Sequence, residues 1–287
     1  MKSGKKRKIL KSVIVLAAIV IVAVVAIAIA EVFNELNVRF VPGYEQISLD
    51  VFQGVDAESL TGEDFDMLFR QAGLGRDAVL AVFNSSDDTV GVLNMHQHNF
   101  FNPPQYTCKR VGAVTREERF YTDEGWLMRG FALADVRNGD ILVTKATHTL
   151  GWRHGHAGIV IDAERGVVLE AIFKGRPSAI QNISHWQAYP TFIQLRLRNE
   201  EISEQAAIFA SENLTNVYYS LFAGLFPRFE SEIRSTQCAH LPWYAYMYFG
   251  YDLDSSGIWP VTPRGISNSE HLEIVQIFGV DPGELWR

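Results

Sequence analysis

The hydrophobic pattern of the chain begins with an uninterrupted apolar run, Val13 to Ala30, that contains no charged residue. At about 1.5 Å per helical residue, and with Ile9 and Leu10 before it, this run can nearly cross a hydrocarbon core of ~30 Å. It therefore predicts a transmembrane helix over residues 9–30. A buried helix of a soluble core is disfavoured because the run has no polar face.

Residues 1–30 also hold six basic residues and no acidic one: Lys2, Lys5, Lys6, Arg7, Lys8 and Lys11. Because a basic flank stays on the cytoplasmic side, we expect residues 1–8 to form a cytoplasmic tail and residues 31–287 to lie outside. The apolar run is longer than the usual core of a signal peptide, which favours a single-pass signal anchor in the cell membrane. Cleavage after Ala30, which would give a secreted protein, is the alternative.

After the apolar run the pattern becomes mixed, and residues 31–55 are predicted to be a linker. Thr61 followed by acidic residues is typical of a helix start, and apolar residues follow at helical spacing as far as Ala72. Residues 78–83 predict a second helix.

The next stretch, residues 84–125, is predicted to be rich in loops, with a firm break at Asn102-Pro103-Pro104. We therefore expect residues 56–130 to form a helical extension that packs on the domain after it.

From Phe131 the pattern changes to short apolar stretches separated by turn residues. Strands are predicted over residues 140–144, 155–161, 166–173 and 192–198, and helices over residues 204–215 and 238–249. Strands followed by helices indicate an α+β domain with an antiparallel sheet, here residues 131–287.

Composition changes this picture in two ways. The net charge of the 287 residues is −7, but beyond residue 30 the chain carries 20 basic and 33 acidic residues. An acidic globular part lacks the basic face that binds phosphates, so we expect no nucleic-acid partner. Two cysteines in so long a chain do not form a disulfide framework.

Three reactive groups stand where the predicted elements can bring them together. Cys238 opens an apolar helix, His156 lies on one strand and Glu170 lies on the next. The positive end of a helix dipole favours a thiolate nucleophile, an imidazole takes its proton, and a carboxylate orients the imidazole. These residues predict a cysteine hydrolase.

The pairing of His156 with Glu170 depends on the register of two strands. If Glu170 pairs with His156, their side chains lie directly opposite each other; if it pairs with Gly158, they lie diagonally on the same face. A shift of one residue would place them on opposite faces and exclude the site.

Four segments carry a resemblance to a known family: Gly139-Asp140-Ile141-Leu142, His156-Ala157-Gly158-Ile159-Val160, Leu169-Glu170-Ala171 and Gln237-Cys238. In this order they resemble the NlpC-type papain-like cysteine hydrolases, and more narrowly their circularly permuted branch. In that branch, to which lecithin:retinol acyltransferase is distantly related, the histidine strand precedes the cysteine helix. The resemblance implies a permuted papain-like fold with Cys238 as nucleophile, His156 as base and Glu170 as third residue.

The resemblance also implies a substrate class, because members commonly cleave peptide amides of the bacterial cell wall and some act on lipids or other acyl groups. We therefore expect an enzyme that cleaves cell-wall peptides through a thioester, without a cofactor. Two alternatives remain open. One is a lipid-directed acylhydrolase or acyltransferase, which a cleft walled by Leu221, Phe222, Leu225 and Phe226 would favour. The other is a non-catalytic module that binds the wall or a partner.

Several residues near the predicted nucleophile have secondary roles. Gln237 and His154 are candidates for contacts with the substrate or with an oxyanion. Pro242 lacks a backbone donor and predicts a kink or an irregular first turn in its helix. Trp186 is expected to be a core residue or a cleft wall.

The remaining candidates concern metals and thiols. His148, His154, His156 and His240 could gather, but neither HExxH nor paired CxxC motifs are present, so we predict no metal. Cys108 is expected to be a structural or free thiol, and a disulfide with Cys238 is the alternative.

Overall fold

The computed structural model describes residues 2–36, 39–173, 175–225, 229, 232–257 and 259–286, with the backbone alone for residues 2–10 and 36. Met1 of the predicted tail and Phe226 of the predicted lipid cleft lie outside the described residues.

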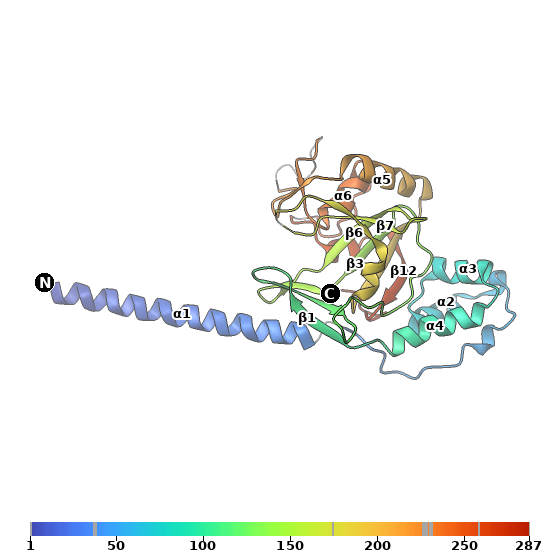
Figure 1. The fold of residues 1–287 in the computed structure, drawn as a ribbon, viewed down its shortest axis with the longest axis horizontal. Helices are drawn as coiled ribbons and strands as arrows, with labels where there is room; N and C mark the ends of the chain where they lie inside the picture. The colour runs from blue at the N-terminus through green and yellow to red at the C-terminus, as the bar shows by residue number, and fades with distance from the viewer. Residues whose placement is uncertain are drawn as a thin grey trace.

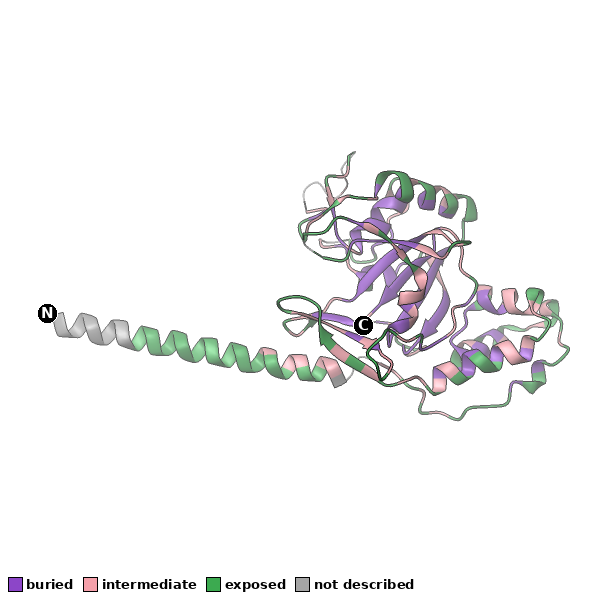
Figure 2. Cartoon of the chain, viewed as in Figure 1, coloured by how far each residue is buried: buried purple, intermediate pink, exposed green. Residues whose placement is uncertain are grey.

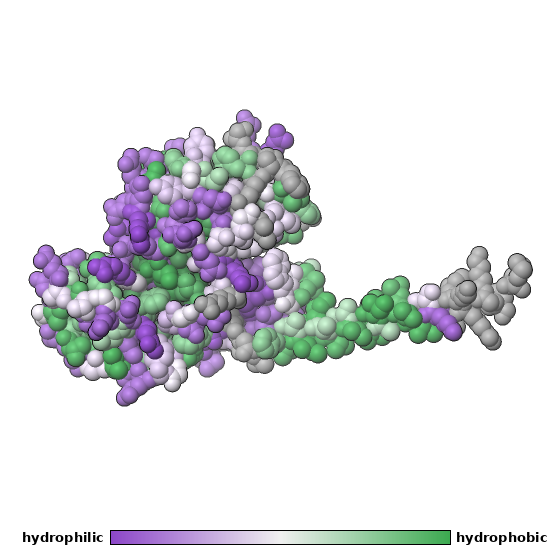
Figure 3. Space-filling view, turned by 180° about the vertical axis from the view of Figure 1, so that it is seen from behind, coloured by the Kyte–Doolittle hydropathy of each residue, from purple (hydrophilic) through white to green (hydrophobic). Residues whose placement is uncertain are grey.

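A long N-terminal helix, α1 (Lys2–Leu36), projects from the globular body (Figure 1). Its stretch Lys11–Glu35 is long and apolar enough to cross a membrane or to act as a signal sequence. Its side chains are exposed over most of that length (Figure 2), and they form a continuous apolar surface (Figure 3). The helix continues six residues beyond the predicted end at Ala30, so the predicted linker begins in a helical conformation.

The body is built on a larger antiparallel sheet with strand order β12-β9-β3-β6-β7-β8. Its strands are β3 (Ile141–Thr144), β6 (His156–Asp162), β7 (Val167–Glu170), β8 (Ala179–Asn182), β9 (Phe192–Leu197) and β12 (Leu272–Phe278). The antiparallel α+β prediction is confirmed. The edge strands β8 and β12 were not predicted.

Helices α5 (Glu200–Asn213) and α6 (His240–Met247) lie together at one side of this sheet (Figure 1). Their buried side chains form one core with alternate sheet residues such as Ile141, Ile159 and Leu195. The intervening positions, such as Leu142 and Val160, pack instead with aromatic residues that include Trp186. Both faces of the sheet are therefore buried, which explains the nearly continuous apolar strands.

A helical layer precedes the sheet in the chain. It contains η1 (Asp50–Phe52), η2 (Ala57–Ser59), α2 (Gly62–Ala72), α3 (Arg76–Ser85) and α4 (Thr89–Phe101). Thr61 and Asp64 form a capping box at α2, as its predicted start requires. The layer has its own apolar core, which reaches Val275 on β12.

The prediction that residues 84–125 are rich in loops is wrong. They form α4 and then a hairpin of β1 (Tyr106–Arg110) and β2 (Thr115–Phe120). Helix α4 has polar side chains at buried positions; Gln97, for example, donates to Gln71 at 2.8 Å. Its sequence therefore lacks the regular spacing of apolar residues by which a helix is recognised. The hairpin is rich in charged residues because β1 is largely open to solvent.

A smaller antiparallel sheet joins this hairpin to β4 (Thr147–Thr149) and β5 (Trp152–Arg153), in the order β1-β2-β4-β5. The last turns of α1 lie against it: Asn34 donates to the Gly151 carbonyl at 2.8 Å, and Gly151 donates to Glu31 at 2.7 Å. The remaining elements are β10 (Tyr218–Tyr219), β11 (Ser235–Thr236), η3 (Ile183–Ala188) and α7 (Pro263–Ser267).

Candidate active site

Cys238 lies in a turn directly before α6, which begins at His240 rather than at the predicted Cys238. Pro242 therefore falls in the first turn, where a backbone N–H has no acceptor within the helix. The helix starts later than predicted, and Pro242 fits its first turn without a kink. Just before it, the side-chain oxygen of Gln237 accepts from the backbone N–H of Ala239 at 2.9 Å.

The β6–β7 pairing brings the predicted base and its partner together. Gly158 pairs with Glu170, which is the diagonal register, so His156 and Glu170 project from the same face. The Nε2 of His156 lies 2.6 Å from Oε2 of Glu170, and both side chains are buried. Since a carboxylate accepts, Nε2 is the donor.

Gly158 makes this contact possible. A Cβ at this position would lie 2.9 Å from Cγ of Glu170 and 2.9 Å from Cγ1 of Val168. Such a contact is too short, so the Glu170 side chain can cross to His156 only because residue 158 has none.

Glu170 has two further partners on η3. Trp186 donates its Nε1–H to Oε1 of Glu170 at 2.9 Å, and Nε2 of His185 lies 3.0 Å from the same oxygen. Burial alone would raise the pKa of Glu170, but hydrogen bonds from His156 and His185 hold it well below its usual value. The carboxylate therefore stays ionised although it is buried.

Two acceptors face the ring of His185. Its Nδ1 lies 2.6 Å from the carbonyl oxygen of Asn182, and its Nε2 faces the Glu170 carboxylate. The sequence reasoning missed this residue; its only signal is its position next to Trp186 in a polar segment that follows β8.

His156 also lies beside Cys238, near enough that the cysteine raises the pKa of the imidazole. Because Nε2 faces Glu170, Nδ1 is the nitrogen left for the sulfur. Burial lowers the pKa of His156, but the hydrogen bonds with Cys238 and Glu170 outweigh burial and raise it to about 10. The Trp186 ring stacks on the imidazole at 5.4 Å between centroids, which fits its prediction as a wall. A thiol, an imidazole and a carboxylate in this order can carry out nucleophilic catalysis.

Of the two predicted accessory residues, Gln237 contacts the thiol and His154 bonds elsewhere. The Cys238 thiol donates to Oε1 of Gln237 at 3.4 Å, while Nε2 of Gln237 donates to the Val261 carbonyl at 2.6 Å. Gln237 thus turns its acceptor, not its donors, toward the sulfur. His154 is held by Thr149, at 3.0 Å, and by the Gly155 carbonyl, at 2.8 Å.

Apolar side chains lie on the segment that leads to the thiol. Strand β10 pairs with β11, which immediately precedes Gln237 and Cys238. Tyr219 is near enough to Cys238 that burial and the charge of the sulfur both raise its pKa. The following residues Leu221 and Phe222 are 62% and 69% exposed. Leu221 and Phe222, here called the apolar rim, offer a surface for an apolar part of a substrate.

The other cysteine has a similar set of neighbours. Sγ of Cys108 lies 3.7 Å from Nε2 of His148, and Nδ1 of His148 lies 2.6 Å from Oε2 of Glu31. Cys108 and Cys238 are both free thiols, as expected. Among the described residues, Glu35, Cys108 and His148 are a group whose ligand atoms could hold a metal ion.

Comparison with known proteins adds no relative to this description. No protein-family model matches the chain. No curated protein and no solved structure is significantly similar to it. The interpretation of the site therefore rests on the geometry and chemistry of its own residues.

Proposed function

We propose that the chain is a cysteine hydrolase with a permuted papain-like fold that cleaves amide bonds through a thioester. The observation that carries the proposal is the position of His156, which lies beside Cys238 and contacts the ionised Glu170 at 2.6 Å. Distant parts of the chain thus supply the three groups that such chemistry requires.

In the proposed reaction His156 takes the proton of Cys238, and the resulting thiolate attacks the carbonyl carbon of the substrate. The tetrahedral intermediate collapses as His156 returns the proton to the leaving amine, which gives a thioester on Cys238. His156 then takes a proton from water, the hydroxide adds to the thioester, and the thiol and a carboxylic acid are released. Glu170 stabilises the imidazolium in both steps.

The proposed location is the outer face of a cell membrane, with α1 as a single-pass anchor. The length and exposure of the apolar helix and its basic flank support this topology. The proposed substrate is the peptide of a cell wall. That choice rests on the family resemblance and on a location where such a polymer is accessible.

The test uses the full-length protein in detergent. A thiol-reactive probe is applied across a range of pH to the wild type, Cys238→Ala, Cys108→Ser and His156→Ala. We expect labelling at Cys238 that depends on His156, and digestion of purified peptidoglycan that mass spectrometry assigns to one amide bond. A Cys238 that reacts equally fast in His156→Ala would contradict the proposal and favour a non-catalytic binding module.

The exposed apolar rim favours one second candidate, a lipid-directed acylhydrolase or acyltransferase. Leu221 and Phe222 follow β10, the strand that pairs with β11 before the thiol, and α1 would hold the site close to a bilayer. The two functions differ in what they release. Free fatty acid from phospholipid vesicles, lost in Cys238→Ala and reduced in Phe222→Ser, would support the second; release of peptides alone would exclude it.

A further inference from the structure

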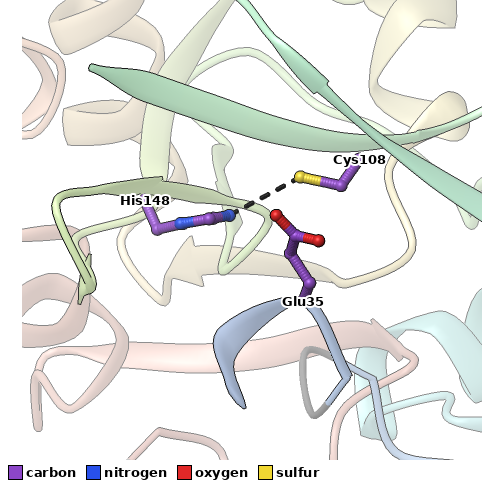
Figure 4. Close-up of side chains that lie close together, drawn as sticks. All are labelled: Glu35, Cys108 and His148. Atoms are coloured by element: carbon purple, nitrogen blue, oxygen red, sulfur yellow. Dashed lines mark hydrogen bonds between the residues drawn. The ribbon is translucent and has the colours of Figure 1, made fainter. Parts of the chain in front are cut away.

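A group of metal-ligating side chains lies where α1 meets the smaller sheet, outside the proposed active site. Glu35 comes from the last turn of α1, Cys108 from β1 and His148 from β4. One ligand atom from each lies within 4.8 Å of the other two. The Glu35 carboxylate points between the sulfur and the imidazole (Figure 4).

The spacing of two of these ligands fits zinc. Zinc–sulfur and zinc–nitrogen bonds of ~2.3 and ~2.0 Å at a tetrahedral angle place the two ligand atoms about 3.5 Å apart. Sγ of Cys108 and Nε2 of His148 are 3.7 Å apart. His148 is completely buried, so its position is fixed by the surrounding structure.

The second shell also has the form that zinc sites use. Nδ1 of His148 lies 2.6 Å from the carboxylate of Glu31, one helical turn before Glu35 on α1. A carboxylate behind a histidine fixes the ring so that the other nitrogen faces the metal. Glu31 stands behind the ring in this way, although the two atoms are not aligned as a hydrogen bond.

The charge of the surroundings agrees with a divalent cation. The buried Glu118 lies next to the group, with Oε1 3.2 Å from Nε2 of His148, and its two oxygens accept from Arg153. Glu31, Glu35 and Glu118 together face two arginines, because Arg116 pairs with Glu35 and Arg153 pairs with Glu118. The balance leaves one negative charge, and a metal-bound thiolate adds another.

We propose that Glu35, Cys108 and His148 bind a zinc ion, and that this ion fastens the end of α1 to the smaller sheet. The ligands come from segments far apart in the chain, so no spacing motif signals them. The site acts on the orientation of the body relative to α1. It does not depend on the chemistry at Cys238.

The test measures zinc in full-length protein purified in detergent and dialysed against micromolar zinc, and then against metal-free buffer. We expect about one zinc per chain in the wild type and in Cys238→Ala, which keeps the proposed ligands. Cys108→Ser and Glu35→Gln should each retain at least about tenfold less metal. Circular dichroism checks that both variants fold.

Two spectroscopic and chemical readouts make the result specific. Cobalt in place of zinc should give a thiolate charge-transfer band that Cys108→Ser abolishes and Cys238→Ala keeps. In Cys238→Ala, zinc should protect Cys108 from alkylation and a chelator should restore the reaction. A wild type that binds no zinc, or a folded Cys108→Ser that binds it equally well, would overturn the site and leave the proposed hydrolase unaffected.

Discussion

The protein contains two groups of a cysteine, a histidine and a glutamate, and their geometry is similar. In each, a thiol lies next to one ring nitrogen and a carboxylate lies 2.6 Å from the other: Cys108 with His148 and Glu31, and Cys238 with His156 and Glu170. Both thiols are partly buried. Residue types and spacing therefore do not separate the two groups.

The surrounding charges do separate them. Around Cys108, burial and the carboxylates of Glu118 and Glu35 raise the pKa of the thiol to about 12 in the absence of a cation. That thiol stays protonated at neutral pH unless a metal displaces its proton. Near Cys238 the neighbouring group is His156, whose pKa is raised to about 10. An excess of carboxylates suits cation binding, whereas an imidazole that holds the thiol proton well suits covalent chemistry.

The largest expected effect comes from removing each thiol in turn. Cys238→Ala should lower hydrolysis by on the order of 10⁴-fold or more, as loss of a nucleophile does. Cys108→Ser should leave the rate within about twofold when zinc is saturating. Turnover of a peptidoglycan fragment, followed by mass spectrometry, compares the two. Equal losses would mean that the two groups are not functionally distinct.

Loss of the carboxylate beside each histidine should also affect hydrolysis unequally. Glu170→Gln keeps an acceptor near His156 but removes the charge that stabilises the imidazolium, so kcat should fall on the order of 10³-fold. Glu31→Gln is the matched control in the other group and should leave kcat unchanged. A Glu170→Gln enzyme with full activity would remove the third residue from the proposal.

The fit at Gly158 offers a steric test. Gly158→Ala introduces a Cβ that pushes the Glu170 side chain away from His156, and a displacement of about 1 Å can lower kcat roughly 10²-fold. Gly62→Ala is the control, because a Cβ there has no neighbour within 4 Å. Steady-state kinetics and circular dichroism of both variants separate misplacement from unfolding.

His185 should have a smaller effect, because it acts on Glu170 and not on the thiol. His185→Gln removes the imidazole that contacts the ionised Glu170, and a hydrogen bond to a charged group is worth about 1.5 kcal/mol or roughly tenfold in kcat. The acidic limb of the pH–rate profile should also move to higher pH, since Glu170 then ionises less readily. An unchanged pH profile would restrict His185 to a structural role.

The smallest expected effect is on thermal stability. The lowered pKa of Glu170 contributes stability above its unfolded value of about 4.5, and this is lost as the pH falls. The raised pKa of His156 contributes stability below its unfolded value of about 6.5, and this is lost as the pH rises toward about 10. The Tm difference between wild type and Glu170→Gln, a few degrees, should therefore be largest at pH ~4.5–6.5. Calorimetry across pH measures it.

Much of the fold could be predicted from the sequence because its strands are short, apolar and separated by turns. The site required an even register between β6 and β7, and the structure has its diagonal form. Pro242 marked the start of α6 as unusual, and the helix begins at His240, which places the proline in its first turn. These features depend on local sequence, where period and proline geometry carry the information.

The missed features depend on contacts between distant segments. Helix α4 escaped prediction because Gln97 and His96 occupy buried positions that an apolar period would reserve for hydrophobic residues. The partnership of His185 with Glu170 requires η3 to fold back on the sheet. Glu35, Cys108 and His148 meet only because α1 continues past residue 30 and packs on the smaller sheet.

The most direct measurement compares the two thiols in one molecule. Full-length protein in detergent, freed of metal by a chelator, is treated with limiting iodoacetamide at neutral pH, and mass spectrometry gives the alkylation rate at each cysteine. We predict that Cys238 reacts at least about tenfold faster than Cys108, and that His156→Ala removes the difference. Equal rates in the wild type, or a fast Cys238 in His156→Ala, would contradict the assignment of nucleophile and base.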